Sequence, residues 1–276
     1  MAFFNKLTGC FTDIIEKIKE VIGFGIPTAF VTGIRIASID LKKATLVFDV
    51  LVTNPSRFTI PLTDINYLLE SDDRKLLSGL IPDSGTISPK GSTTIVIPVT
   101  LVYEDILNTF TDIRPGSVIP YKMKVEFGVE VPIFGKKTIP IEKSGEIPIP
   151  TIPLISLEKI EFKKFSFEEC VVAEHLKLEN MNEFEMGVTS LELELQLSGK
   201  SIGSAGLEKT GSVGKSGVSM LVIPLTFRPV NLGMAVWEVL GGNEATYALK
   251  GNLGVDTPFG SMTFPMEKDG GTSFIK

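Results

Sequence analysis

The chain has 276 residues, of which 43% are hydrophobic, and a formal net charge of −6. This length and apolar content allow two ordinary domains with buried cores. Its largest basic clusters are pairs of lysines, which argues against a nucleic-acid interface.

The cysteine content and the absence of apolar spans indicate where the protein works. Cys10 and Cys170 are the only cysteines, which argues against a disulfide scaffold and indicates a reducing compartment. No apolar run in the sequence is long enough to span a bilayer. The first residues contain acids and lack the continuous apolar core of a secretory signal. We therefore expect a soluble cytoplasmic protein.

Residues 1–25 are predicted to form an amphipathic helix that precedes the first domain. Lysines and acids balance on its polar face, whereas helices that lie on membranes usually have a basic polar face. We therefore favour packing on the first domain over contact with a membrane or partner. Deletion of residues 1–22 should then destabilise that domain. The apolar residues follow helical spacing: Phe3, Phe4, Leu7, Phe11, Ile14, Ile15, Ile18, Val21 and Ile22.

The rest of the chain repeats itself at an offset of 126 residues, the distance from Asn54 to Asn180. At this offset SGTISPKGSTTIVIPVTL (84–101) matches TGSVGKSGVSMLVIPLTF (210–227), and Tyr121 matches Tyr247. A constant offset over such a span predicts two copies of one domain. We place them at residues 26–152 and 153–276, joined by the proline-rich stretch EIPIPTIPLIS (146–156).

Each copy is predicted to be rich in β-strands. Residues 191–198 alternate apolar and polar side chains, and residues 45–54 and 170–180 are also predicted to be strands, with glycine and proline in the turns. The spacing of apolar residues from Ile160 to Phe167 indicates a bulge or a turn. We expect an all-β protein of two tandem antiparallel β-sandwiches, of fibronectin type III or immunoglobulin-like type. The insertions 103–116 and 228–242 predict one short helix in each copy.

The stretch GSVGKSGVS (211–219) is close to a loop that binds nucleotide phosphates. That motif requires an earlier glycine, but Lys209 stands in its place. In the repeat, Lys215 aligns with Pro89, while Gly217 aligns with Gly91. A turn that leads into a strand explains both copies, so we expect no nucleotide site.

The search for catalytic or metal-binding residues finds no constellation. His175 is the only histidine, and its neighbours Lys177 and Glu179 suggest a solvated strand face. Cys10 and Cys170 have no second cysteine at a ligand spacing, so both are interpreted as apolar fillers. We expect no enzyme activity, no cofactor and no metal.

Several other residues have a structural interpretation. Glu192 and Glu194 alternate with leucines and should point to water. The aromatic residues near the insertions are interpreted as core residues rather than as a ligand pocket: Trp237, Phe227 and Phe110. Glu174 aligns with Phe48 on the predicted core face, and no partner for its carboxylate can be named.

The stretch VLVTNPSRFTIPLTDINYLLESDDRKLLSGLIPDSG (50–85) resembles the WHy domain of the late embryogenesis abundant (LEA) type 2 family. A divergent copy, LKLENMNEFEMGVTSLELELQLSG (176–199), keeps Asn180 and Phe184 but has Met181 where the family has proline. The resemblance covers about residues 30–275 and is greatest to tandem-domain plant desiccation-related proteins. It implies a fibronectin-like fold, a role in tolerance of water deficit, and no known reaction. It supplies no catalytic residues, and Asn54 and Pro55 are motif positions that end a strand.

Two functions remain open at this point. The first is a non-enzymatic stress-tolerance protein that contacts stress-labile proteins or membrane surfaces through an apolar-rich surface. A mean hydropathy of +0.25 and an isoelectric point near 5.1 favour it. The alternative is a protein that binds an apolar small molecule or a lipid. Nucleic acid is not an expected partner, and the oligomeric state is left open.

Overall fold

The structure is a computed structural model that describes residues 25–131 and 135–276. Apart from Gly25, the helix predicted over residues 1–25 lies outside the described residues, as does Cys10, so both interpretations stay predictions. Most of the described residues are in β-strands, which confirms the β-rich fold. The chain divides into two compact units.

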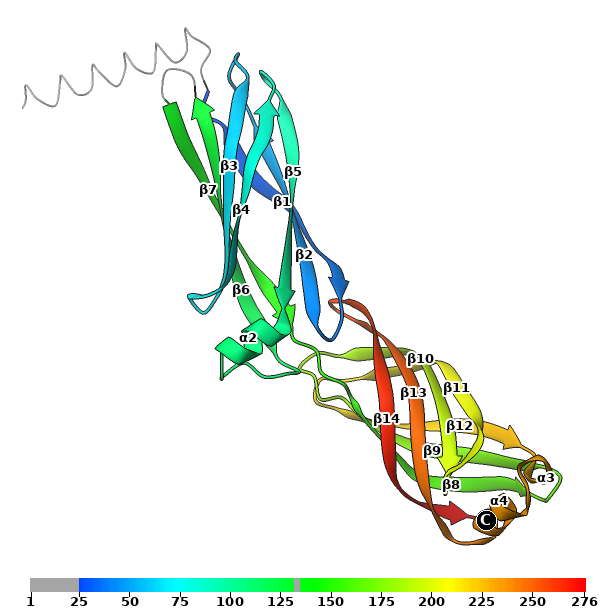
Figure 1. Ribbon diagram of the computed structural model, residues 1–276. Coiled ribbons are helices and arrows are strands. Elements are labelled where there is room, and N and C mark those ends of the chain that lie inside the picture. Colours follow the sequence, from blue (N-terminus) through cyan, green and yellow to red (C-terminus); the bar gives the residue numbers. More distant parts are fainter. Residues whose placement is uncertain (1–24, 132–134) are drawn as a thin grey trace, which may run out of the picture. The chain divides into compact units, whose positions relative to one another are not determined.

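The first unit contains two sheets. In strand order these are β1-β2-β5 and β4-β3-β6-β7. In Figure 1, β3, β4, β6 and β7 lie on one side of this unit and β1, β2 and β5 on the other. The strands are β1 (Thr28–Ile39), β2 (Lys43–Thr53), β3 (Ile60–Ser71), β4 (Arg74–Ile87), β5 (Ser92–Val102), β6 (Val118–Val131) and β7 (Gly135–Pro148).

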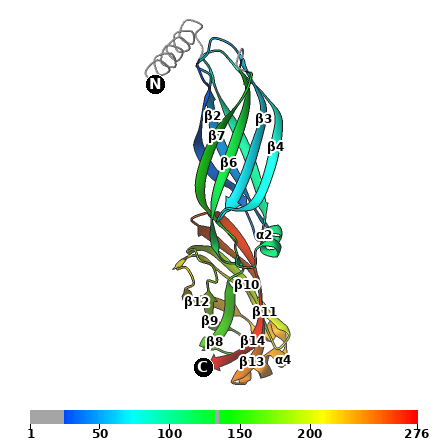
Figure 2. The same ribbon diagram turned by 90° about the vertical axis from the view of Figure 1, so that its left-hand side faces the viewer.

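The second unit consists of Ile147–Lys276 together with two earlier segments, Ser38–Ala44 and Val102–Ile119. Its strands form one seven-stranded sheet in the order β11-β10-β13-β14-β8-β9-β12, and Figure 2 shows them from a second side. They are β8 (Leu154–Phe165), β9 (Cys170–Glu179), β10 (Met186–Leu197), β11 (Lys200–Val213), β12 (Val218–Phe227), β13 (Glu244–Thr257) and β14 (Gly260–Ile275). The domain bounds drawn from the sequence, 26–152 and 153–276, remain predictions.

The strand orders show the internal repeat. Each strand of β1-β2-β5 and of β4-β3-β6-β7 has its counterpart seven strands later, in β8-β9-β12 and β11-β10-β13-β14. The same sequence pattern therefore builds the same strand neighbours twice, and the layout of two similar domains agrees with the prediction.

The second unit differs from the prediction of a purely antiparallel arrangement. Ser273–Ile275 of β14 pairs in parallel with Lys159–Glu161 of β8. This pairing joins the strands β11-β10-β13-β14 to the strands β8-β9-β12 in one sheet. The register of β8 shifts between Leu157 and Lys159. A bulge bends a strand, and the residues just after this one are those that pair with β14. The predicted break between Ile160 and Phe167 contains both a second register shift, between Phe162 and Lys164, and the turn that follows the end of β8 at Phe165.

The core of the second unit follows the predicted alternation. Leu191, Leu193, Leu195 and Leu197 of β10 are all at most 2% exposed. Successive side chains of a strand point to opposite faces, so the glutamates between these leucines face outward. Such burial contributes about 1.5–3 kcal/mol for each large apolar side chain.

The insertion helices are α2 (Tyr103–Thr109), α3 (Pro229–Leu232) and α4 (Met234–Gly241). One helix was expected in each copy, and this is wrong for the second insertion, which holds two. Gly233 separates α3 from α4 and has φ of 92°, a conformation that glycine adopts without strain. None of the helices in the described residues is long and apolar enough to cross a membrane.

Candidate functional site

The buried side chain of the motif asparagine Asn54 hydrogen-bonds to two loops of the first unit, an arrangement that we call the asparagine clamp. Its Nδ2 donates to the carbonyl oxygens of Phe58 (2.7 Å), Ser88 (3.1 Å) and Ile87 (3.2 Å). Its Oδ1 accepts from the amide and the hydroxyl of Ser56, at 2.9 and 2.6 Å. Because the side chain satisfies buried backbone groups, its role in this structure is to join the end of β2 to the turn before β5.

Asn180 makes the same clamp in the second unit. Its Nδ2 donates to the carbonyl oxygens of Phe184 (2.7 Å), Gly214 (3.0 Å) and Val213 (3.5 Å). Its Oδ1 accepts from the amide of Asn182 at 2.9 Å. The repeat thus preserves a hydrogen-bond network even where Met181 replaces the proline of the first copy.

The stretch that resembles a phosphate-binding loop is a turn between β11 and β12, as predicted. Its tip is formed by Lys215 and Ser216, and Ser216 has a φ of 50°. The amide of Ser216 donates to the carbonyl of Asn182, and that of Gly217 to the carbonyl of Gly214, both at 2.9 Å. Phosphate loops direct such amides at the anion, whereas here these two are already engaged within the protein.

The residue without an assigned partner, Glu174, lies in the core of the second unit and is 1% exposed. Its Oε1 is buried and has no hydrogen-bond partner among the described residues. Burial raises the pKa of this carboxyl to about 7. The alignment with Phe48 placed this residue on the core face correctly, but sequence alone could not show that its oxygen lacks a donor.

His175 lies on the opposite face of β9, where it contacts Glu161 on the neighbouring strand. The distance from His175 Nε2 to Glu161 Oε2 is 3.0 Å, and the histidine side chain is 19% exposed. Hydrogen bonds from Lys163 and then His175 lower the pKa of Glu161. Among residues 25–131 and 135–276, no group of three His, Cys, Asp or Glu side chains could hold a metal ion.

Cys170 is fully buried at the start of β9. Its thiol donates to the carbonyl of Ser166, with a sulfur-to-oxygen distance of 3.4 Å. Burial raises the pKa of this thiol, which disfavours the reactive thiolate. The placement agrees with the interpretation of Cys170 as a core residue.

The aromatic residues near the second insertion pack against each other. Trp237 of α4 stacks on Phe165 with ring centroids 4.7 Å apart, and it meets Phe167 edge-on at 5.4 Å. Phe227 is 8% exposed at the end of β12. These contacts hold α4 against the sheet, but only Phe227 is a core residue as predicted, since Trp237 is half-buried and Phe165 is exposed. In the first insertion, the Phe110 amide donates to the carbonyl of Ile106, which closes α2.

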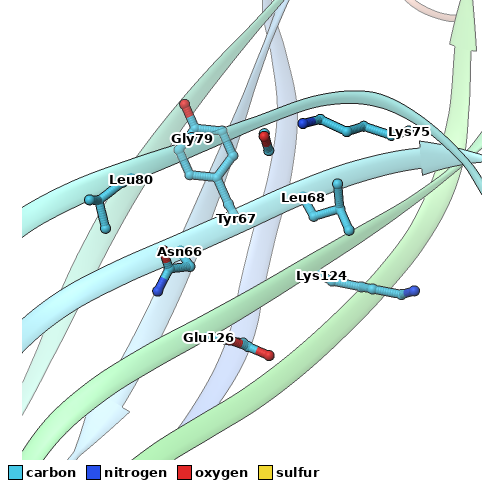
Figure 3. Close-up of a pocket in the computed structure, with 9 residues that line it drawn as sticks. Asn66, Tyr67, Leu68, Lys75, Gly79, Leu80, Lys124 and Glu126 are labelled. Carbon is cyan, nitrogen blue, oxygen red and sulfur yellow. The ribbon is translucent and has the colours of Figure 1, made fainter.

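The first unit carries a surface groove of about 670 Å³ along β3, β4 and β6. In Figure 3 the ring of Tyr67 extends toward Gly79 on β4, where a side chain would collide with it. Leu68 and Leu80 add apolar surface to the lining. Lys124 is also in the lining, and its Nζ lies 2.6 Å from Oε2 of Glu70. The hydrogen bond to Glu70 raises the pKa of Lys124.

The outer strand β12 carries a column of exposed apolar side chains that we name the β12 column. It consists of Val218, Met220 and Val222, which are 54%, 56% and 49% exposed. The strand is the last in its sheet and contains no charged residue. At the equivalent positions of β5 the first repeat has Ser92, Thr94 and Val96, of which only Val96 is apolar and exposed. A column of three apolar residues is therefore found only in the second repeat, and the sequence analysis did not single it out.

Comparison with known proteins identifies relatives of both repeats. The profile of the family described as late embryogenesis abundant protein (LEA type 2) matches residues 49–145 and 175–270. A desiccation-related LEA14 protein of Arabidopsis thaliana is 31% identical over 143 residues, which is 50% of this chain and 95% of that protein. A desiccation protectant Lea14 homologue of Glycine max is 30% identical over 51% of this chain and 96% of its own.

Two solved structures are similar to part of this chain. The solution structure of a late embryogenesis abundant protein is 26% identical, covers 53% of this chain and 87% of its own, and has a TM-score of 0.39. A solution structure from Arabidopsis thaliana is 31% identical over 46% of this chain and 86% of its own, with a TM-score of 0.37.

Proposed function

Because this chain belongs to the late embryogenesis abundant family of type 2, we propose that it protects other macromolecules during water deficit without catalysing a reaction. The printed names of its relatives, which include a desiccation protectant, support this role. Their lengths correspond to about half of this chain, and the chain contains the family unit twice.

The mechanism we propose is noncovalent contact with partly unfolded proteins, made by the β12 column. The observation that carries it is the outward row of Val218, Met220 and Val222, all about half exposed on an outermost strand. An extended chain can lie along such an edge and match alternate side chains. Outer strands are usually guarded by charges, and β12 has none.

Pro224 limits how far a partner strand can extend along this edge. It lies in β12 two residues after Val222, and proline cannot donate a hydrogen bond to a ladder. A partner strand could therefore pair without meeting this proline only along Val218–Ile223. A site this short suits brief contact with segments that unfold during drying, rather than a permanent complex.

The test is protection of a labile enzyme through drying and rehydration. We expect the enzyme to keep more activity with this protein than with an equal mass of serum albumin. Dried vesicles that contain a self-quenching dye measure membrane protection in parallel. Recovery of enzyme activity no better than with albumin would contradict the protection of proteins. If only the vesicles were protected, the protein would act by contact with membranes and not with unfolded proteins.

The groove on β3, β4 and β6 supports the alternative function, binding of an apolar small molecule. Tyr67, Leu68 and Leu80 would contact such a ligand. Mass spectrometry of compounds that copurify with the full chain tests this alternative. A ligand lost on the change Leu80→Asp would favour it over protein contact.

We also infer that the sheets of each repeat form a sandwich of fibronectin type and that the protein works in the cytoplasm. The repeated strand orders support the first inference, and the low cysteine content supports the second. Location of a fluorescent fusion in plant cells tests the second inference, and labelling of a secretory compartment would contradict it.

A further inference from the structure

Glu174 stands among apolar side chains in the middle of β9. The residues paired with it are Ile160 on β8 and Ile223 on β12, and both are at most 1% exposed. On its own strand, the neighbours that point the same way include Val172 and Leu176. At the equivalent position of the first repeat, Phe48 is fully buried. A carboxyl group thus replaces an aromatic ring in an otherwise similar core.

No charged group in the described core compensates this carboxyl. The other buried polar residues of the second unit, Asn180, Asn182 and Thr272, are uncharged. The ionisable groups that share the core are the Cys170 thiol on the same strand and the Tyr247 phenol on β13, which accepts a hydrogen bond from the Leu157 amide at 3.1 Å.

The ionisable groups next to Glu174 in the sheet lie on its outer face. His175 follows it on β9 and contacts Glu161 of β8 at 3.0 Å, and Lys177 contacts Glu179 at 3.3 Å. No residue of β12 is charged. A negative charge on Glu174 would therefore face apolar groups on both neighbouring strands, which is costly without a partner.

We propose that the stability of the second unit depends on the protonation of Glu174. The unit stays folded while this carboxyl is neutral and unfolds more readily once the carboxyl has lost its proton. The inference rests on the buried oxygen without a partner and on the apolar surroundings. It does not depend on the proposed protective function. The elements that would loosen first are β8, β9 and β12, because the charge forms between them.

The sign of the pH dependence follows from the protons held by each state. In the unfolded chain the carboxyl ionises near its usual pKa of 4.5, whereas in the folded unit it keeps its proton up to about 7. Between these values the folded state binds one more proton, so stability falls as the pH rises. The unfolding equilibrium constant then increases about tenfold per pH unit and becomes constant above about pH 7.

Other carboxylates act outside this window and in the opposite direction. A backbone hydrogen bond from Lys42, aided by one from Lys43, lowers the pKa of Asp40, and a hydrogen bond from Lys164 lowers that of Glu169. These groups lose their stabilising contribution only as the pH falls below their unfolded value near 4. Among these carboxyl groups, only Glu174 therefore titrates between about pH 5 and pH 7.

Trp237 gives a signal that is specific to the second unit. It is the only tryptophan in the chain and stacks on Phe165 at 4.7 Å. Urea unfolding of the full chain, followed by its fluorescence, is measured from about pH 5 to pH 8. We expect the midpoint to fall steadily up to about pH 7 and then level off. The variant Glu174→Gln, uncharged at every pH, should show no fall.

The matched control is His175→Gln, which removes the only histidine and should keep the fall. A fall that persists in Glu174→Gln, or disappears in His175→Gln, would overturn the proposal. If Glu174→Gln does not fold, carbon-13 NMR of labelled glutamate in the native protein decides. A carboxyl that titrates near pH 7 supports the proposal, and the absence of any carboxyl that titrates above about pH 5.5 contradicts it.

Discussion

The ring of Tyr247 occupies the space that a side chain on Gly270 would need. A Cβ atom on Gly270 would lie 2.7 Å from Cε1 of this ring, closer than such atoms approach. The first repeat shows the same relationship, with a Cβ on Gly145 only 2.6 Å from the hydroxyl of Tyr121. In each copy, the absence of a side chain on a glycine of the last strand therefore leaves room for a tyrosine ring near the start of the neighbouring strand.

We predict that Gly270→Ala destabilises the second unit by about 1–3 kcal/mol, the usual cost of forcing extra atoms into a packed site. The ring must move, and its hydroxyl would lose the hydrogen bond from the Leu157 amide. Urea unfolding followed by Trp237 fluorescence measures the effect. The control is Gly271→Ala, because a Cβ there meets no atom within 4 Å. Equal stability of the two variants would show that the ring does not constrain Gly270.

Asn180→Ala should cost about 2–3 kcal/mol, because it leaves buried backbone groups without partners. The carbonyls of Phe184 and Gly214 and the amide of Asn182 all bond to this side chain. The control is Asn252→Ala, at an exposed position of β13, which should be nearly neutral. A loss below about 0.5 kcal/mol for Asn180→Ala, measured by the same unfolding, would mean that the clamp is dispensable.

The extent of sequence-based prediction is clearest at these residues. Repetition at a fixed offset identified Asn180 and Tyr247 as counterparts of Asn54 and Tyr121, and alternation identified the buried face of β10. The parallel pairing of β14 with β8 could not be predicted, because the two strands are distant in sequence and no local pattern reports which distant strands become neighbours.

The candidate sites were less predictable than the fold. Alternation shows which side chains of β12 face outward, but it does not show that β12 is the last strand of its sheet. The exposure of Met220 follows from this alternation, and only the position of β12 at the end of the sheet follows from the strand order. Similarly, the unpaired oxygen of Glu174 depends on which donors the opposite elements supply, and no local pattern reports this.

Lys215→Ala should leave stability within about 0.5 kcal/mol of the parent, as is usual for exposed surface residues, since Lys215 is exposed at the tip of a turn. We further expect no ATP or GTP binding by either protein in isothermal titration calorimetry. Binding by the parent that is lost in Lys215→Ala would contradict the interpretation of this loop as a structural turn.

Cys170 should react with iodoacetamide only when the second unit opens, because the thiol is buried and its pKa is raised. In a Cys10→Ser background, mass spectrometry should show slow labelling of the native protein and rapid labelling in urea. Labelling at the same rate in both conditions would indicate that Cys170 is accessible in the native state.

The most direct test of the proposed mechanism compares Met220→Lys with Thr94→Lys in the enzyme-drying assay. Both variants place one lysine at equivalent, exposed positions of an outer strand, so they change net charge equally. Unfolding of each variant, measured first, confirms that the fold is retained. We predict that Met220→Lys loses at least about half of the protection and that Thr94→Lys keeps it. Equal protection by the two variants would contradict contact through the β12 column.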